Sequence, residues 1–168
     1  MLMMDVVSVH KLLQEVGLNR FYHLLVERLR YDFSQWDSFQ KSARLCRYFE
    51  DGAIELMPIS NASYYSNKVV STYPHNAKRQ HFTVIGHGML LDANTGEMQL
   101  FCEMTLLTAI RTAAVSILAS QLMAKQDTRS IAVIGCGAQS EFQVLAHHFF
   151  YPEVKWTCYD IQLKAMQR

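Results

Sequence analysis

The stretch SIAVIGCGAQSEFQ, residues 130–143, decides how the C-terminal part of the chain folds. Its apolar run Ile131–Ile134 is typical of a parallel strand that is buried on both faces. The turn Gly135-Cys136-Gly137 follows, then a helix from Ala138 to about Phe150 and a second strand from Val154 to Tyr159. This order of strand, glycine turn, helix and strand predicts the first β-α-β unit of a Rossmann-type sheet.

The glycine turn has the residues that a bound pyrophosphate needs. Gly135 allows the tight turn, Gly137 lets the backbone approach the phosphates, and the helix N-terminus supplies free N–H groups. Ser140 takes the place of the third glycine and is still small enough for close helix–strand packing. Asp160 ends the second strand, where its carboxylate can accept hydrogen bonds from adenosine-ribose hydroxyls and repel a 2′-phosphate. We therefore expect NAD as the cofactor, and the alternative is a plain strand-to-helix turn with Asp160 solvated.

Two helices are expected before residue 31. Ser8 can cap the first and Asn19 the second, because both side chains can accept hydrogen bonds from free backbone N–H groups. The second helix has an apolar stripe that predicts packing on a sheet, formed by Phe21, Leu24, Leu25 and Leu29.

The segment from Ala43 to Glu103 has the pattern of a largely antiparallel sheet. Asp51-Gly52 separates two strand-like runs and favours a tight hairpin turn. A third run, YYSNKVVSTY, ends at Pro74, and a second hairpin surrounds the turn-forming residues DANTG. The segment 105–126 is rich in Ala and Leu and lacks Gly and Pro, which predicts one long helix.

These elements predict an α/β chain with two parts. Residues 1–126 form a substrate-binding and dimerisation domain of α+β type with a largely antiparallel sheet, and residues 105–126 are its linking helix. Residues 127–168 form the first β-α-β part of a Rossmann dinucleotide-binding domain. Such a sheet needs about six strands, so we expect the second domain to be truncated.

Composition excludes several classes of function. The formal net charge is +1 with no basic block, so we expect no nucleic-acid partner. The apolar runs fall short of the roughly 20 residues that a membrane span needs, and we expect a cytoplasmic protein without a membrane partner. The four cysteines lie far apart without a CxxC pair, which favours reduced thiols over a disulfide framework or a metal site: Cys46, Cys102, Cys136 and Cys158.

Several motifs in order along the chain resemble the ornithine cyclodeaminase and mu-crystallin family. They are DFSQWDSFQKSAR, GAIELMPIS, YYSNKVVSTYP, the TG turn of DANTGEM, TLLTAIRTAAVSILAS and IAVIGCGAQSEFQ. One departure is Thr72-Tyr73-Pro74-His75-Asn76, where the family usually has a Gly-His-Pro-Gly-Asn-like run. Another is length, because family members are roughly twice as long.

The resemblance implies a homodimer that binds a small amino acid and NAD. Carried over by motif, the substrate-binding residues are Arg44, Glu55, Lys68 and Arg111. The residues that the resemblance and the turn assign to the cofactor are Thr83, Arg111, Gly135, Gly137, Ala138, Gln139 and Asp160.

Elementary chemistry agrees with this assignment. Fixed cations can hold the carboxylate of an α-amino acid so that its Cα–H faces the nicotinamide. Lys68 lies among apolar and aromatic residues, and burial favours its neutral amine, so we also expect a catalytic proton-transfer role for it. The alternative for each cation is an ordinary surface charge.

The function that the resemblance implies is NAD-dependent conversion of L-ornithine to L-proline and ammonia. We expect that this chain alone is inactive, because the family's catalytic Asp and much of the nicotinamide pocket belong to the half that has no counterpart here. Two alternatives stay open: a related amino-acid dehydrogenase or ketimine reductase, and a non-catalytic fragment or dimerisation module.

Overall fold

A computed structural model describes residues 1–167, which form two compact units. The first consists of Met1–Glu15 and Ser34–Thr108, and the second of Val16–Phe33 and the residues from Ala109 onward. The first unit holds a mixed sheet and the second holds a parallel strand pair with helices. The functional boundary expected at residue 127 stays a prediction, since compactness does not test it.

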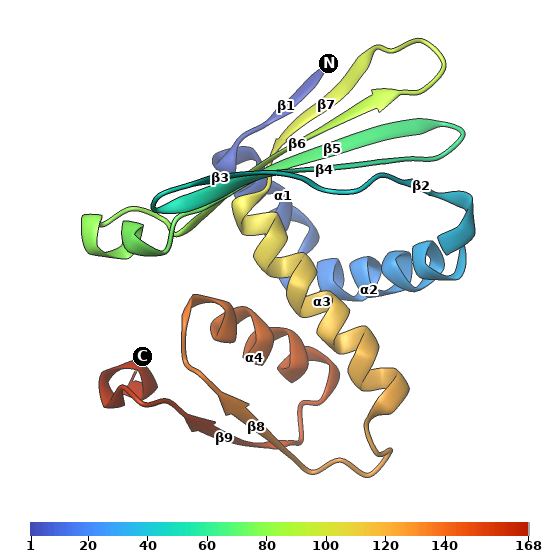
Figure 1. Ribbon diagram of the computed structural model, residues 1–168. Coiled ribbons are helices and arrows are strands. Elements are labelled where there is room, and N and C mark those ends of the chain that lie inside the picture. Colours follow the sequence, from blue (N-terminus) through green and yellow to red (C-terminus); the bar gives the residue numbers. More distant parts are fainter. Residues whose placement is uncertain (168) are drawn as a thin grey trace. The chain divides into compact units, whose positions relative to one another are not determined.

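The sheet of the first unit has seven strands in the order β1-β7-β6-β5-β4-β2, and β3 also pairs with β4 (Figure 1). Every pairing is antiparallel except that of β1 with β7, which confirms the largely antiparallel sheet. The strands are β1 (Leu2–Met4), β2 (Gln40–Lys41), β3 (Leu45–Phe49), β4 (Gly52–Ser60), β5 (Tyr64–Thr72), β6 (Val84–Asp92) and β7 (Met98–Glu103).

The two expected hairpins are confirmed, but the first turn differs from the expected one: Glu50 and Asp51 form it, and Gly52 begins β4 without the positive φ of a glycine turn. β3 and β4 flank Asp51, with Phe49 opposite Gly52. In the β6–β7 turn, the Asp92 carboxylate accepts hydrogen bonds from the backbone N–H groups of Asn94 (2.7 Å) and Thr95 (3.0 Å). β5 ends before Pro74, which begins the 3-10 helix η2 (Pro74–Arg79).

Helix α1 (Val6–Val16) starts earlier than the sequence predicts. The Asp5 carboxylate accepts a hydrogen bond of 2.8 Å from the backbone N–H of Ser8, so Asp5 caps this helix and Ser8 lies within it. Helix α2 (Leu18–Ser34) begins directly after Gly17, whose φ of 82° reverses the chain between the two helices. The expected caps at Ser8 and Asn19 are therefore wrong.

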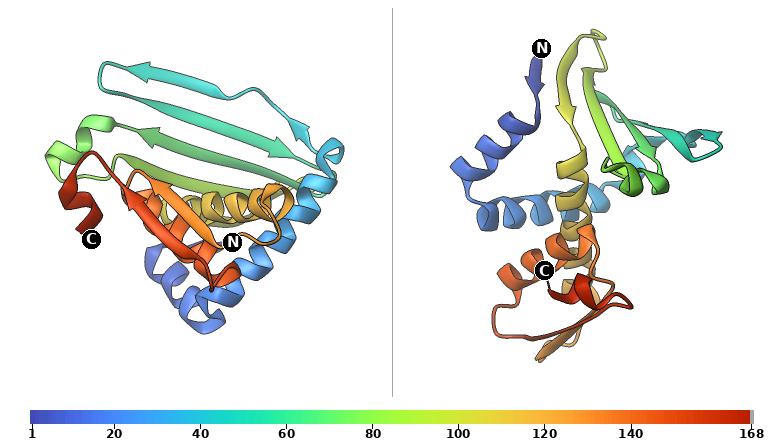
Figure 2. Two further views of the ribbon diagram at one scale, coloured as in Figure 1. Left: turned by 90° about the horizontal axis from the view of Figure 1, so that it is seen from below. Right: turned by 90° about the vertical axis from the view of Figure 1, so that its left-hand side faces the viewer.

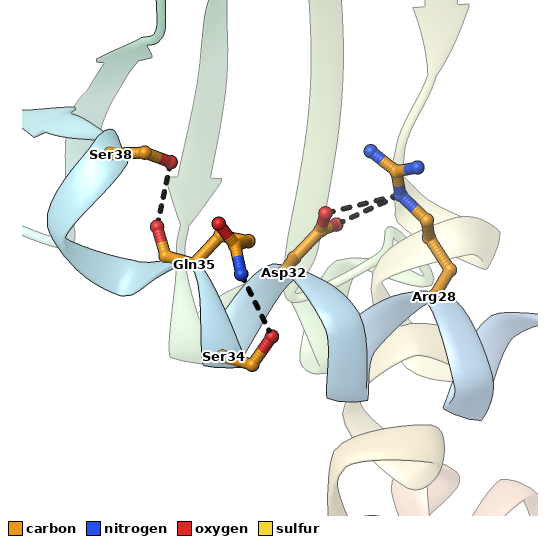
Figure 3. Close-up of polar contacts among 5 residues, drawn as sticks. All are labelled: Arg28, Asp32, Ser34, Gln35 and Ser38. Carbon is orange, nitrogen blue, oxygen red and sulfur yellow. Dashed lines mark hydrogen bonds and ion pairs between the residues drawn. The ribbon is translucent and has the colours of Figure 1, made fainter.

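Helix α2 packs on helix α4, and its buried face is not the expected apolar stripe, since Leu24 of that stripe is 51% exposed. Its buried residues are Tyr22 and Val26, and the Tyr22 ring lies 5.9 Å from the ring of Phe149 in α4 (centroid to centroid). Near its end Arg28 pairs with Asp32, and short polar contacts follow into the 3-10 helix η1 (Trp36–Ser38) (Figure 3).

The second unit confirms the predicted order of strand, turn, helix and strand, but its first strand is not buried on both faces as expected, since Ile134 is 84% exposed. Its elements are β8 (Ser130–Ile134), α4 (Ala138–Phe150), β9 (Lys155–Tyr159) and the 3-10 helix η3 (Leu163–Gln167). β8 and β9 run parallel to each other (Figure 2). In their register Ile131 is opposite Trp156.

Helix α3 (Thr105–Met123) is by length and composition apolar enough to cross a membrane, contrary to the expectation from the sequence. Its inward side is nevertheless a protein core, with Ile110 and Ile117 almost fully buried. It also makes polar contacts with other helices: Ser120 Oγ lies 3.0 Å from His147 Nε2 of α4, and Gln121 accepts from Arg30 of α2 at 2.7 Å. We interpret α3 as a core helix on this ground.

Candidate functional site

Three of the predicted substrate-binding residues lie on one face of the seven-stranded sheet. Cross-strand partners share a face, and Lys68 of β5 is opposite Met57, two residues beyond Glu55 on β4. Arg44 lies just before β3, and its Nη1 is 3.7 Å from Oε1 of Glu55. The fold therefore brings together residues 44, 55 and 68, which are separated in sequence.

The Arg44–Glu55 pair is open to solvent and so accessible to a ligand. The Arg44 side chain is 65% exposed and that of Glu55 is 27% exposed. An ion pair this exposed contributes only about 0–1 kcal/mol to stability. The contribution to stability therefore does not explain this pair. A bound anion could replace Glu55 at the Arg44 guanidinium or share the guanidinium with it.

Two glycines shape the same sheet face beside Lys68. Gly88 is opposite Lys68 and Gly86 is opposite Val70. A Cβ at Gly88 would lie 2.8 Å from Cγ of Met104, and one at Gly86 would lie 3.3 Å from its Cβ. The glycines therefore let Met104, the residue before α3, pack against the sheet next to Lys68.

The start of α3 is tied to the same strands. Thr105 Oγ1 accepts a hydrogen bond of 3.1 Å from the Gly86 backbone N–H. The Glu103 carboxylate caps the helix by accepting from the backbone N–H groups of Thr105 and Leu106. The start of α3 is consequently held beside the Lys68 face by hydrogen bonds between backbone N–H groups and the side chains of Thr105 and Glu103.

Thr83, a predicted cofactor contact, lies directly before β6 in an anchored loop. Its carbonyl accepts a hydrogen bond of 2.8 Å from the Tyr73 backbone N–H. The η2 segment of this loop is held by Asp51, which lies 3.0 Å from Arg79 Nη2 and 3.4 Å from His75 Nδ1. Hydrogen bonds from His75 and Arg79 lower the pKa of Asp51.

The turn after β8 has the geometry that the sequence predicts. Gly135 has φ of +93°, a conformation that side chains rarely adopt, and its N–H donates to the Tyr159 carbonyl at 2.8 Å. Gly137 is the N-cap of α4 with extended backbone, and no atom lies within 4 Å of the position that a Cβ would occupy. The backbone at Gly137 is therefore open to close approach by a ligand.

Asp160 is bound to this turn from the end of β9. Its Oδ2 accepts a hydrogen bond of 2.7 Å from the Cys136 backbone N–H, and its Oδ1 accepts one of 2.7 Å from that of Gln162. These bonds, that of Gln162 first, lower the pKa of Asp160, so the carboxylate is charged at neutral pH. Each oxygen keeps a lone pair with which it can accept a further hydrogen bond.

Gln139 and Arg111 are placed by helix packing within the second unit. The Gln139 side-chain amide, in the first turn of α4, donates to the Ala109 carbonyl of α3 at 3.0 Å. Arg111 is exposed and lies two residues further along α3. Ala138 begins α4 directly after the turn.

A cavity of about 710 Å³ adjoins the turn. The turn lines it with Cys136, Gly137 and Ala138, and β9 lines it with Cys158. An open glycine backbone, a helix N-terminus and an ionised carboxylate together fit a dinucleotide, because they match its pyrophosphate and ribose hydroxyls. Among the described residues no group of three or more His, Cys, Asp or Glu side chains could hold a metal ion.

Sequence reasoning missed two features of these sites. The contacts of Asp51 with His75 and Arg79 were hidden because Asp51-Gly52 was explained as a turn. Cys158 was treated as an isolated thiol, although its position two residues before Asp160 was a usable signal that it lies near the turn.

Comparisons with known proteins agree with this architecture. Residues 6–168 match the model of the ornithine cyclodeaminase/mu-crystallin family. An ornithine cyclodeaminase of Agrobacterium fabrum is 41% identical over 152 residues, which are 90% of this chain and 43% of that protein. An alanine dehydrogenase of Archaeoglobus fulgidus is 31% identical over 122 residues, 71% of this chain and 37% of that protein.

A solved structure extends the likeness to three dimensions. It is a Δ1-pyrroline-2-carboxylate reductase of Thermococcus litoralis in complex with NADH and L-proline, with a TM-score of 0.80 and 26% identity. The match covers 99% of this chain and 51% of that one. The chain thus spans about half the length of the relatives it matches, and it belongs to the ornithine cyclodeaminase/mu-crystallin family.

Proposed function

We propose that this chain provides the amino-acid-binding and NAD-binding elements of an ornithine cyclodeaminase, which converts L-ornithine to L-proline and ammonia. The observation that carries the proposal is the shared sheet face of Arg44, Glu55 and Lys68 in a chain that also has the glycine turn with Asp160. The 41% identity to a protein named ornithine cyclodeaminase supports this reaction over others.

The sheet face is suited to hold an α-amino acid by its charged ends. The Arg44 guanidinium would bind the substrate carboxylate through two parallel hydrogen bonds. Glu55 keeps Arg44 in place and offers a carboxylate to a substrate ammonium. Lys68, half-buried on the same face, would bind the carboxylate and move a proton to or from the substrate nitrogen. Arg111, which the resemblance also assigns to the substrate, belongs to the second unit, and this role stays a prediction.

The second unit would hold NAD, which when bound takes up and returns the hydride of the substrate Cα. The turn from Gly135 to Ala138 would bind the pyrophosphate through backbone N–H groups. Asp160 would accept hydrogen bonds from the adenosine-ribose hydroxyls and repel a 2′-phosphate. Gln139 and Arg111 complete the proposed contacts of this unit, and Thr83 of the first unit stays a predicted cofactor contact.

We propose a homodimer that forms through the other face of the seven-stranded sheet. That face exposes large apolar side chains, among them Leu45 (67% exposed), Phe49 (50%) and Ile85 (37%). Exposed apolar surface of this extent is typical of protein interfaces. The proposed setting is the cytoplasm, without nucleic-acid or membrane partners.

We propose that the chain of this length has no turnover by itself. More than half of the Agrobacterium fabrum enzyme has no counterpart in it. Measurable proline production by the purified chain would contradict this part of the proposal.

A fusion tests the substrate assignment. The chain would be joined to the C-terminal part of the Agrobacterium fabrum enzyme that lies beyond the matched region, and proline and NADH would be measured with L-ornithine and substoichiometric NAD. We expect proline without net NADH. Lys68→Ala and Arg44→Ala should abolish proline formation, whereas Lys11→Ala, at an exposed pair with Glu15 on α1, should leave it intact.

The second candidate is a related dehydrogenase or ketimine reductase. The likeness to a pyrroline-2-carboxylate reductase and to an alanine dehydrogenase favours it. In the fusion assay this candidate predicts net NADH production from an amino acid, or NADH consumption with a cyclic imine. Neither cofactor change is expected for a cyclodeaminase, since its NAD is regenerated in each turnover.

A further inference from the structure

Two cysteines line one cavity at the glycine turn, although helix α4 separates them in the sequence. Cys136 lies between Gly135 and Gly137, and Cys158 lies on β9 two residues before Asp160. In the parallel register Cys158 is opposite Val133, three residues before Cys136. Both side chains line the same cavity.

Backbone contacts hold the two residues in this arrangement. Gly135 N–H donates to the Tyr159 carbonyl at 2.8 Å, which extends the β8–β9 pairing into the turn. The Cys136 N–H then donates to the Asp160 carboxylate at 2.7 Å. Tyr159 and Asp160, which follow Cys158, therefore each accept a hydrogen bond from the turn that contains Cys136.

The surroundings of the two thiols give them different roles. Cys158 is exposed, so an oxidant can reach it from solvent. Cys136 is half-buried, and burial, the neighbouring Cys158 thiol and Asp160 all raise its pKa. A thiol with a raised pKa reacts slowly with a free oxidant, but it can still resolve a neighbour that is already oxidised.

We propose that Cys136 and Cys158 are a redox modification site that forms a disulfide and thereby weakens dinucleotide binding at the turn. Hydrogen peroxide oxidises the Cys158 thiol to a sulfenic acid and releases one water. The Cys136 sulfur then attacks the Cys158 sulfur, the S–O bond breaks, and a second water leaves as the disulfide forms. Two thiols and one peroxide give one disulfide and two waters.

The consequence for binding follows from where the disulfide forms. Two bonded sulfurs must approach to about 2.05 Å with a fixed torsion. The turn takes up this movement, because the backbone dihedral angles of its two glycines change more easily than those of other residues. A pyrophosphate needs the N–H groups of this same turn in place, so oxidation should lower NADH affinity at least tenfold. This consequence rests on the proposed NAD function.

The test uses the full chain in two parallel measurements. The reduced chain is treated with stoichiometric hydrogen peroxide, alkylated, digested and analysed by mass spectrometry for a link between the Cys136 and Cys158 peptides. In parallel, NADH is titrated by fluorescence before oxidation, after it, and after dithiothreitol. We expect the link, the tenfold loss of affinity, and recovery with dithiothreitol.

Two variants separate this site from general oxidation. Cys158→Ser should form no intramolecular link and should bind NADH equally well with and without peroxide. Cys46→Ser, which changes a half-buried cysteine of the other unit, should respond like the unmodified chain.

Each contrary result has a distinct meaning. Oxidation of Cys158 to sulfinic acid without a link to Cys136 would overturn the disulfide. A link with unchanged NADH affinity would overturn the control of binding. Failure of the reduced chain to bind NADH would refute the proposed function and the control of binding, while the mass measurement would still decide whether the disulfide forms.

Discussion

Single substitutions of Gly135 and Gly137, the glycines of the turn after β8, distinguish a role in backbone conformation from a role in close ligand approach. Gly135 has φ of +93°, and an alanine held in a left-handed conformation costs roughly 1–2 kcal/mol. For a chain of this size about 1 kcal/mol shifts Tm by roughly 2–4 °C. We therefore expect Gly135→Ala to lower Tm by roughly 2–8 °C.

Gly137→Ala should leave stability nearly unchanged and weaken NADH binding instead. Gly137 has φ of −79°, and nothing lies within 4 Å of its Cβ position, so the unliganded protein can accept the methyl group. Alanine is a poorer N-cap than glycine but restricts the unfolded chain, and these effects of about 0.5–1 kcal/mol oppose each other. A bound pyrophosphate would meet the methyl group, so NADH affinity should fall at least tenfold, about 1.4 kcal/mol.

Both variants would be compared by thermal melting and by NADH fluorescence titration. We expect a lower Tm for Gly135→Ala, and weaker NADH binding with a near-normal Tm for Gly137→Ala. Unchanged NADH affinity in Gly137→Ala would refute the close-approach role. A Tm loss in Gly137→Ala as large as that in Gly135→Ala would refute the claim that the site is open.

Three further predictions concern the loop, the core and the proposed dimer. Asp51→Asn should weaken the anchor of η2 and speed tryptic cleavage within it several-fold, whereas Asp92→Asn, in another hairpin, should not; equal rates would contradict the anchor. Ile117→Ala should lower the free energy of unfolding in urea by about 2–5 kcal/mol, since Ile117 is fully buried. Met123→Ala, at an exposed position of the same helix, should lower it by less than about 0.5 kcal/mol. Similar losses in the two variants would contradict the core role of α3. Leu45→Glu should convert the dimer to monomer in sedimentation while NADH binding persists, and an unchanged dimer would exclude this face.

Local signals allowed much of the fold to be predicted from the sequence. The glycine turn, the Asp51-Gly52 hairpin and the helix that begins at Thr105 each depend on residues within a short window. The predicted cap of the first helix was wrong because two polar residues near its start can both act as caps, and in the structure it is Asp5 that accepts the hydrogen bond from the Ser8 N–H. The apolar length of α3 was underestimated, because polar residues interrupt its apolar runs although the mean hydropathy of the whole helix is high.

Contacts between strands that lie far apart in the sequence could not be predicted from local patterns. The parallel contact of β1 with β7 joins the first residues to a strand about a hundred residues later, and no local pattern encodes it. The same holds for the shared face of Arg44 and Lys68, which depends on the register of three strands. The resemblance supplied these residues, and the register explains how they come to share a face.

The stretch from residue 130 to Asp160 carries the central claim, and a titration of the purified, reduced chain with NADH and NADPH tests it most directly. The account predicts saturable binding of NADH and at least tenfold weaker binding of NADPH, because the ionised Asp160 carboxylate would oppose a 2′-phosphate. Asp160→Asn should weaken NADH binding and narrow the difference between the two. Equal affinity for both dinucleotides, or no binding of either, would contradict it.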